Sequence, residues 1–226
     1  MIATASESQA TMTRVLLIDD HVLVRESLAR RLEDEPDLSV PQTAGTADEG
    51  LEMAMADGYH VVVMDINMPG MSCFEAARRM KEKQRDLPLV FLSAFWNDAF
   101  IDQATGVGAV GMLSKSEEPE RLIQAIRVVV DGGVFFSEEV RDRISVESSS
   151  PNDLSDIRTR LQLLTPREID VLRSVGMGKS RKQIGASLGI SDNTVAVHTN
   201  RIMRKLDIHD RVGLARFAIK CGLSPL

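Results

Sequence analysis

Long apolar runs are absent from this chain of 226 residues. No stretch approaches the ~20 consecutive apolar residues that a helix needs to span a bilayer, so we expect no membrane partner. The first twelve residues are small and polar, and they lack the basic end and the apolar centre of a signal peptide. We therefore expect a flexible tail over residues 1–12 and a cytoplasmic protein.

Cysteine is also scarce, which argues against a disulfide framework. Cys73 and Cys221 lie far apart, and neither has metal-ligating neighbours at the spacing of a zinc site. Cytoplasmic proteins keep isolated thiols reduced. We expect two reduced, packed cysteines. The chain contains no internal repeat that would indicate a solenoid.

Charge is plentiful but unevenly distributed. Hydrophobic residues make up 43% and charged residues 27% of the chain, as in soluble globular proteins. Residues 1–150 hold 14 Lys and Arg against 26 Asp and Glu, whereas residues 151–226 hold 13 against 7. The two parts therefore differ in the sign of their net charge. This difference favours an acidic domain followed by a basic domain that approaches nucleic acid.

Short apolar runs alternate with helical patterns in the first part of the chain. The runs 15–18, 61–64, 89–92 and 110–113 are continuous, as in strands buried on both faces of a parallel sheet. A weaker strand is expected around 38–40, where Pro41 suits a sheet edge. Amphipathic segments separate the strands at 22–34, 46–56, 73–84, 97–105 and 119–131. The pattern predicts a doubly wound α/β fold with a five-stranded parallel sheet.

The second part of the chain has helix signals and no strand signal. Thr165 and Glu168 form a capping box around Pro166, and Ser180 begins a second such box. Ser191 can cap a helix over 192–206, and Asp210 one over 211–221. These starts predict an all-α, four-helix domain over 161–226. We expect the α/β domain over 13–134 and a linker over 135–160, where the polar stretch 148–153 lies.

Reactive side chains follow the predicted buried strands. Asp19 and Asp20 follow the first, Asp65 the second, Ser93 ends the third, and Lys115 lies just after the fourth. Parallel strands bring their carboxyl ends to one sheet edge, so these groups are expected to converge. Crowded carboxylates favour a bound cation such as Mg²⁺, and a carboxylate can also attack phosphorus. A single Asp after a strand is usually part of a turn or a helix cap, and a single Lys there is usually solvated. The five residues together favour a site.

Residues 14–131 resemble a response-regulator receiver domain, which has a flavodoxin-like fold. The matching motifs are Asp19-Asp20-His21, the run 64–71, Ser93-Ala94 and Lys115. The resemblance implies that Asp65 accepts a phosphoryl group from a sensor histidine kinase. It also implies that phosphorylation alters dimerisation and promoter binding.

The same resemblance implies the remaining roles in this site. Asp20, Asp65 and the backbone carbonyl of Asn67 would ligate Mg²⁺, and Asp19 would help to hold the metal through water. Ser93 and Lys115 would contact the phosphoryl oxygens.

One position departs from the receiver pattern. Met112 stands where such domains usually carry a Tyr or Phe that moves with the switch at Ser93. A flexible methionine either makes that switch less sharply bistable or simply packs while the backbone near Ser93 carries the change.

Residues 164–219 resemble the LuxR-type helix-turn-helix of NarL/FixJ regulators. The matching stretches are 164–168, 182–185, 188–191, 194–198 and 202–206. The resemblance implies binding to double-stranded promoter DNA by a dimer, and the last helix has an apolar stripe that could pair with a second copy.

The recognition helix is expected to begin at Ser191. The residues expected in its core-facing row are Val195, Ile202 and Leu206, and those expected on the opposite face are Ala196, Val197, Thr199, Asn200 and Arg201. Thr194 belongs to the expected DNA-contacting set. The candidates for phosphate contacts are Lys179, Arg181, Lys182, Arg204 and Lys205. Val197 suits a thymine methyl, and Asn200 or Arg201 suits base edges. His198 either packs locally or contacts a phosphate.

Two other functions are alternatives to transcriptional regulation. Phosphatases of the haloacid dehalogenase type need a second acid two residues after the nucleophile, and here that position is Asn67, which cannot be a general acid. A regulator that works without phosphorylation usually loses part of the acidic set, which this chain keeps whole. We therefore expect a regulator that is not an enzyme, beyond catalysing its own phosphoryl transfer and slow dephosphorylation.

Overall fold

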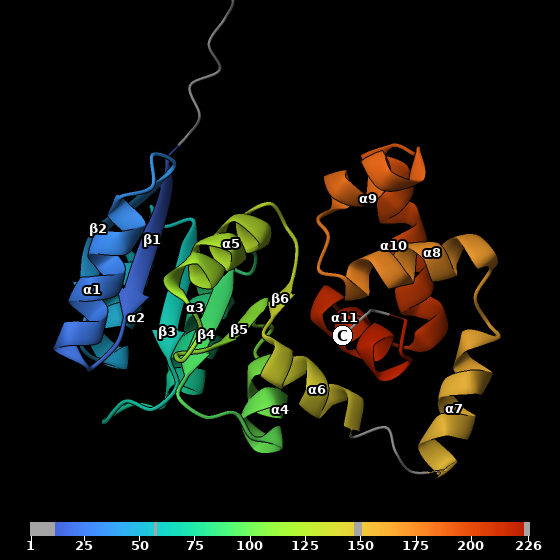
Figure 1. Ribbon diagram of the computed structural model, residues 1–226, viewed down its shortest axis with the longest axis horizontal. Coiled ribbons are helices and arrows are strands. Elements are labelled where there is room, and N and C mark those ends of the chain that lie inside the picture. Colours follow the sequence, from blue (N-terminus) through green and yellow to red (C-terminus); the bar gives the residue numbers. More distant parts are fainter. Residues whose placement is uncertain (1–11, 57, 147–150, 224–226) are drawn as a thin grey trace, which may run out of the picture.

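The computed structural model of the protein describes residues 12–56, 58–146 and 151–223 (Figure 1). An α/β unit and a helical unit lie side by side. Within the described ranges, no helix is both long enough and apolar enough to cross a membrane. The expected tail, apart from residue 12, and positions 147–150 of the expected linker lie outside the described residues.

The α/β unit is built on one parallel sheet. Its strands are β1 (Thr13–Ile18), β2 (Leu38–Ala44), β3 (Val61–Asp65), β4 (Leu89–Ser93), β5 (Gly111–Ser114) and β6 (Phe135–Phe136). Their order is β2-β1-β3-β4-β5-β6, and every pairing is parallel. The doubly wound fold is confirmed, with β2 at one edge as expected. The sheet has six strands rather than five.

Helices cover both faces of this sheet. They are α1 (Val22–Glu33), α2 (Ala47–Met55), α3 (Cys73–Lys83), α4 (Asp98–Gly106) and α5 (Pro119–Val130). Alternate residues of the central strands point into two apolar clusters, one shared with α1 and α5 and the other with α2, α3 and α4. The strands are apolar throughout because both of their faces are buried.

The sixth strand arises from the interval expected to be a linker, 135–160. The Phe135 N–H donates to the Val110 carbonyl at 2.8 Å, and the Ser137 N–H donates to the Met112 carbonyl at 2.9 Å. Helix α6 (Glu138–Val146) follows, with Val140 and Ile144 buried. The same interval contains most of α7 (Pro151–Leu161), so one further helix precedes the four expected in the second domain.

The helical unit contains the expected caps. Its helices are α8 (Pro166–Gly176), α9 (Arg181–Leu188), α10 (Asp192–Leu206) and α11 (Arg211–Lys220). Thr165 and Ser180 form complete capping boxes, and Ser191 and Asp210 accept from the third residue beyond them. Gly189 ends α9 with a positive φ of 65°, a conformation that glycine adopts without strain.

The two units touch through specific contacts. An ion pair of 2.6 Å joins Asp102 of α4 to Arg216 of α11. The Val134 N–H donates to the Gly178 carbonyl at 3.1 Å, and Arg141 of α6 donates to the Gly176 carbonyl at 3.2 Å. Gly178 has a φ of 78°, and a Cβ there would lie 2.2 Å from the Val134 oxygen. The close approach of the two backbones therefore requires glycine at position 178.

Candidate metal centre and nucleic-acid interface

The predicted reactive residues converge at the carboxyl edge of the sheet. Asp19 directly follows β1, Asp65 ends β3 and Ser93 ends β4. Lys115 follows β5, and its N–H donates to the Ser93 carbonyl at 2.8 Å. Asp19, Asp65 and Ser93 are all buried. The parallel register therefore places a nucleophilic carboxylate, a hydroxyl and an ammonium at one edge.

Lys115 joins the two buried carboxylates. Its Nζ lies 2.6 Å from Oδ2 of Asp19 and 2.8 Å from Oδ2 of Asp65. Burial by itself lowers the pKa of the Lys115 ammonium, but hydrogen bonds to Asp19 and Asp65 outweigh that effect, so the pKa lies above its ordinary value. The ammonium is therefore charged at neutral pH and neutralises part of the carboxylate repulsion.

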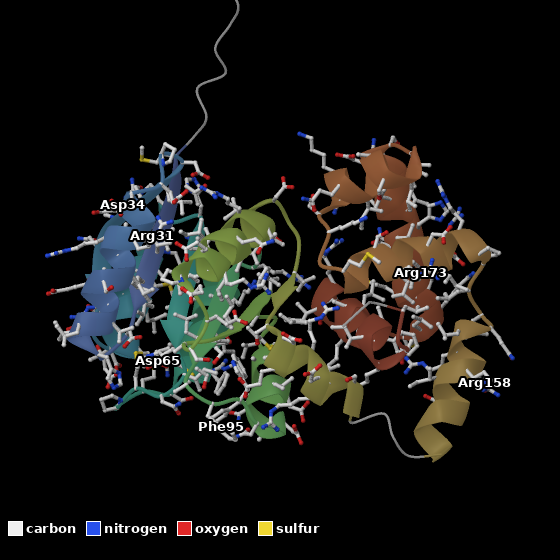
Figure 2. All side chains as sticks on the ribbon, in the orientation of Figure 1. Arg31, Asp34, Asp65, Phe95, Arg158 and Arg173 are labelled. Carbon is white, nitrogen blue, oxygen red and sulfur yellow. The ribbon has the colours of Figure 1, made fainter. Side chains whose placement is uncertain are left out.

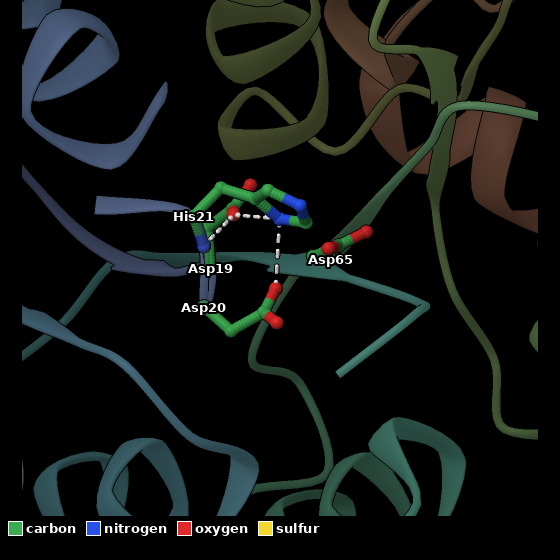
Figure 3. A group of neighbouring side chains, drawn as sticks. All are labelled: Asp19, Asp20, His21 and Asp65. Atoms are coloured by element: carbon green, nitrogen blue, oxygen red, sulfur yellow. Dashed lines mark hydrogen bonds and ion pairs between the residues drawn. The ribbon is translucent and has the colours of Figure 1, made fainter. Parts of the chain in front are cut away.

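A group of potential metal ligands lies beside this ion pair. Asp19, Asp20, His21 and Asp65 each offer a ligand atom, and these atoms lie within 4.8 Å of one another (Figure 3). The Nδ1 atom of His21 is 2.9 Å from Oδ1 of Asp20 and 3.4 Å from Oδ1 of Asp19. Three carboxylates make a donor set that suits a hard cation such as Mg²⁺. The acidic pocket therefore fits the metal that the sequence predicted.

The structure adds His21, for which the sequence predicts no role, to this group of potential ligands. Its position directly after the two aspartates was the available signal. Asn67 contacts Asp65 through its backbone N–H, which donates to Oδ1 at 3.3 Å. The role of the Asn67 carbonyl as a metal ligand stays a prediction.

The Ser93 hydroxyl is engaged with the loop that follows β4. Its Oγ donates to the Phe95 carbonyl at 2.6 Å and accepts from the Phe95 N–H at 3.1 Å. Asp65 and Phe95 lie toward the same edge of the sheet (Figure 2). A contact between Ser93 and a phosphoryl group stays a prediction.

Met112 is fully enclosed in the sheet. It pairs with Phe91 of β4 and Phe136 of β6, and none of its surface is exposed. The strand β6 that pairs with this position is not among the strands predicted from the sequence. The signal was the run 134–136 after two glycines, which is too short to identify a strand by periodicity.

The second predicted site is the exposed face of α10. Val197 is 47% exposed, and Asn200, Arg201 and Arg204 are also exposed. Thr194, Ala196 and His198 are half-buried, and Nδ1 of His198 has no hydrogen-bond partner among the described residues. The placement of Thr199 on this face was wrong, because Thr199 is buried and its hydroxyl donates to the Val195 carbonyl at 2.9 Å.

The predicted phosphate-contacting residues differ in their surroundings. Arg181 and Lys182 are exposed at the start of α9, and Lys179 is half-buried in the preceding turn. Lys205 instead forms an ion pair of 2.7 Å with the buried Glu168 of α8. Burial alone raises the pKa of the Glu168 carboxyl, but hydrogen bonds from Lys205 and Thr165 bring it below its ordinary value. This ion pair therefore links α10 to α8. A contact between Lys205 and DNA stays a prediction.

Comparison with known proteins identifies both parts of the chain. Residues 15–127 match the response regulator receiver domain, and residues 162–218 match the bacterial regulatory proteins of the luxR family. A nitrate/nitrite response regulator protein homolog of Haemophilus influenzae is 33% identical over 88% of this chain and 92% of its own length. The transcriptional regulatory protein UhpA of Escherichia coli is 34% identical over 91% of this chain and 97% of its own.

A solved structure agrees with the assignment. The two-component response regulator of the LuxR family from Aurantimonas sp. has a TM-score of 0.59 and 29% identity, covering 62% of this chain and all of its own. RcsB of Salmonella typhimurium shares the fold at a TM-score of 0.56 and 22% identity, over 91% of this chain and 97% of its own.

The chain belongs to the two-component response regulators that join a receiver domain to a LuxR-type helix-turn-helix. It is a DNA-binding regulator of transcription.

Proposed function

We propose that Asp65 is the phosphoacceptor of this regulator and that its phosphorylation controls DNA binding through α10. The observation that carries the proposal is the position of Lys115. Its ammonium contacts both Asp19 and Asp65 at the carboxyl edge of the sheet, with Asp20 beside them. An ammonium that contacts the acceptor carboxylate is placed to bind a phosphoryl oxygen after transfer.

The chemistry is a phosphoryl transfer to a carboxylate. An oxygen of Asp65 attacks phosphorus, the bond from phosphorus to the donor breaks, and its electron pair remains on the leaving group. We infer that the donor is the phosphohistidine of a sensor histidine kinase, whose imidazole leaves and takes up a proton. Mg²⁺, when held by Asp19, Asp20 and Asp65, supplies positive charge to the phosphoryl oxygens. Lys115 supplies a further positive charge from the protein itself.

The chain's own catalysis is limited to this transfer and to slow loss of the phosphoryl group. A phosphatase of the haloacid dehalogenase type would need an acid at position 67 to protonate a leaving group. Asn67 has no ionisable proton, and its backbone N–H contacts Asp65. This residue therefore favours an accumulating aspartyl phosphate over rapid turnover.

The DNA-binding role rests on the exposed face of α10. Val197 offers an apolar side chain that can contact a thymine methyl. Asn200 and Arg201 offer hydrogen bonds to base edges in the major groove. Arg181, Lys182 and Arg204 are free to reach phosphates on either side. We infer that a homodimer, favoured by phosphorylation, binds two half-sites of promoter DNA in the cytoplasm.

Dimerisation through α11 would compete with the receiver. In the structure, α11 packs against α6, and its Arg216 is paired with Asp102 of α4. A second copy that used the same face of α11 would have to displace these contacts. This competition supports a mechanism in which phosphorylation first loosens the contact between the domains.

The proposal is tested by labelling the full chain with acetyl phosphate and Mg²⁺ and measuring its intact mass. Asp65→Asn is expected to abolish the added phosphoryl mass, and Asp20→Ala to reduce it strongly. The matched control is Asp86→Asn, because Asp86 is exposed and precedes β4 at the opposite edge of the sheet. Undiminished labelling of Asp65→Asn would refute the assignment.

A further inference from the structure

The loop between β4 and α4 connects the proposed phosphorylation site to the rest of the protein. Ser93 ends β4, and Phe95 and Trp96 follow it in this loop. The Ser93 hydroxyl has a single proton, which it donates to the Phe95 carbonyl at 2.6 Å. Ser93 cannot give the same proton to a phosphoryl oxygen without releasing that carbonyl. Arrival of a phosphoryl group would therefore free the start of the loop.

Trp96 anchors the other end of this segment inside the protein. Its indole is fully buried, and Nε1 donates to the Leu113 carbonyl of β5 at 3.0 Å. Trp96 belongs to the same apolar cluster as Met112 and Phe136. The aromatic ring beside β5 is thus supplied by the loop rather than by position 112. A movement of the loop would therefore displace the indole ring of Trp96.

Helix α6 contacts both aromatic residues of the loop. Oε1 of Glu139 accepts a hydrogen bond from the backbone N–H of Trp96 at 3.3 Å. The guanidinium of Arg143 lies 5.3 Å from the centre of the Phe95 ring. Arg143 also lies 3.6 Å from Asp98 at the start of α4. Phe95 is 57% exposed, so the Arg143 stacking is a surface contact that can break at little cost.

The opposite side of α6 contacts the DNA-binding domain. Arg141 donates to the Gly176 carbonyl at the end of α8, and α6 packs against α11. Helix α6 therefore touches the loop after Ser93 and the helical domain at the same time. A displacement of α6 would disturb the contacts that hold α11 against the receiver.

We propose that Trp96 and helix α6 couple phosphorylation to the DNA-binding domain, with Glu139 and Arg143 as the residues that sense the loop. The inference rests on the proposed function of Asp65 and names the route by which that site acts. Loss of the Ser93–Phe95 hydrogen bond shifts the Trp96 backbone, which breaks or moves its contact with Glu139. The resulting movement of α6 releases the helical domain. The two states are distinguished by which group accepts the Ser93 proton.

Trp96 is the single tryptophan of the chain, so its fluorescence reports on this step without any substitution. The full chain is treated with acetyl phosphate and Mg²⁺, and phosphoryl occupancy is measured by intact mass in the same samples. We expect the emission maximum and the quenching by acrylamide to change in proportion to occupancy, and neither to change in Asp65→Asn. Modified Asp65 with unchanged emission and quenching would overturn the coupling alone. Absence of any modification would overturn the phosphoacceptor assignment, and the coupling with it.

A pair of neighbouring glutamates tests the role of α6. Glu139→Ala removes the acceptor for the Trp96 N–H, and Glu138→Ala removes the same charge from an exposed neighbour. The readout is the ratio of affinities, with and without phosphorylation, for a duplex selected from a random pool. Coupling of this kind typically gives a factor of about 5–150. We expect Glu139→Ala to lose most of this factor and Glu138→Ala to keep it; equal ratios in the two variants would refute the proposal.

Discussion

Replacing Lys115 with methionine should destabilise the receiver domain and make its stability depend on Mg²⁺. The ammonium lies within 2.8 Å of Asp19 and Asp65, whose side chains are 0% and 2% exposed. Methionine preserves much of the side-chain volume but leaves these two carboxylates without their shared cation. Removing one partner of a buried ion pair typically costs 3–5 kcal/mol. Because the site opens toward the half-buried Asp20, we expect the low end of this range, about 3 kcal/mol.

Unfolding in urea, followed by the fluorescence of Trp96, measures this loss in the receiver itself. We expect Mg²⁺ to stabilise Lys115→Met more than the natural chain, since the metal would replace the missing positive charge. Lys182→Met, on the exposed surface of α9, is the control and should show neither effect. The wild-type pKa of Lys115 is raised, so its contribution is full below the ordinary lysine pKa and is lost as the pH rises through the raised value. Equal stability of the two variants without Mg²⁺ would contradict the role assigned to Lys115.

Three further outcomes follow from contacts in both domains. Glu168→Gln should make the stability of the helical domain, measured by circular dichroism, less dependent on pH in acid. The pKa of Glu168 is lowered in the folded protein. Its contribution to stability is therefore present above the ordinary glutamate pKa and is lost as the pH falls through the lowered value. Equal acid sensitivity in the variant and the natural chain would show that this pair does not matter. Arg204→Ala should weaken binding to all duplexes alike and reduce the salt slope by about 0.9 for a lost phosphate contact, whereas Val197→Ala should change sequence preference; a preference change in Arg204→Ala would reverse these roles. Met112→Leu should keep the change in dimerisation on phosphorylation that sedimentation measures. Met112→Tyr should destabilise the receiver by about 1–3 kcal/mol, because position 112 is enclosed. A larger change in dimerisation in Met112→Tyr, at unchanged stability, would instead support a switching role for this position.

Local signals in the sequence predicted the elements well. The capping boxes at Thr165 and Ser180 are confirmed, because an N-cap depends on residues only three positions apart. The parallel sheet is confirmed because strands buried on both faces produce continuous apolar runs. The convergence of Asp19, Asp65 and Lys115 followed from topology alone, since strand ends share one edge.

Contacts between segments that are distant in the chain could not be predicted from the sequence. Two such contacts are the pairing of Phe136 with Met112 and the hydrogen bond from the Trp96 indole to the Leu113 carbonyl. Both depend on how segments distant in the sequence come together in the fold. The placement of Thr199 did not follow the helical spacing: Thr199 lies four residues after Val195 and three before Ile202, which is the spacing of the buried row, and its hydroxyl bonds within its own helix. Lys205 was assigned by charge alone, although its partner Glu168 lies 37 residues earlier in the chain.

The two-residue strand β6 has a consequence for how the receiver can be isolated. A fragment that ends at residue 134 would lack Phe135 and Phe136, and β5 would become the edge of the sheet. The Val110 and Met112 carbonyls would then lose the N–H groups of Phe135 and Ser137. An unprotected edge strand is a template for pairing with another chain. Such a fragment would self-associate through an edge that the intact protein covers, and its oligomeric state would not report on the natural dimer.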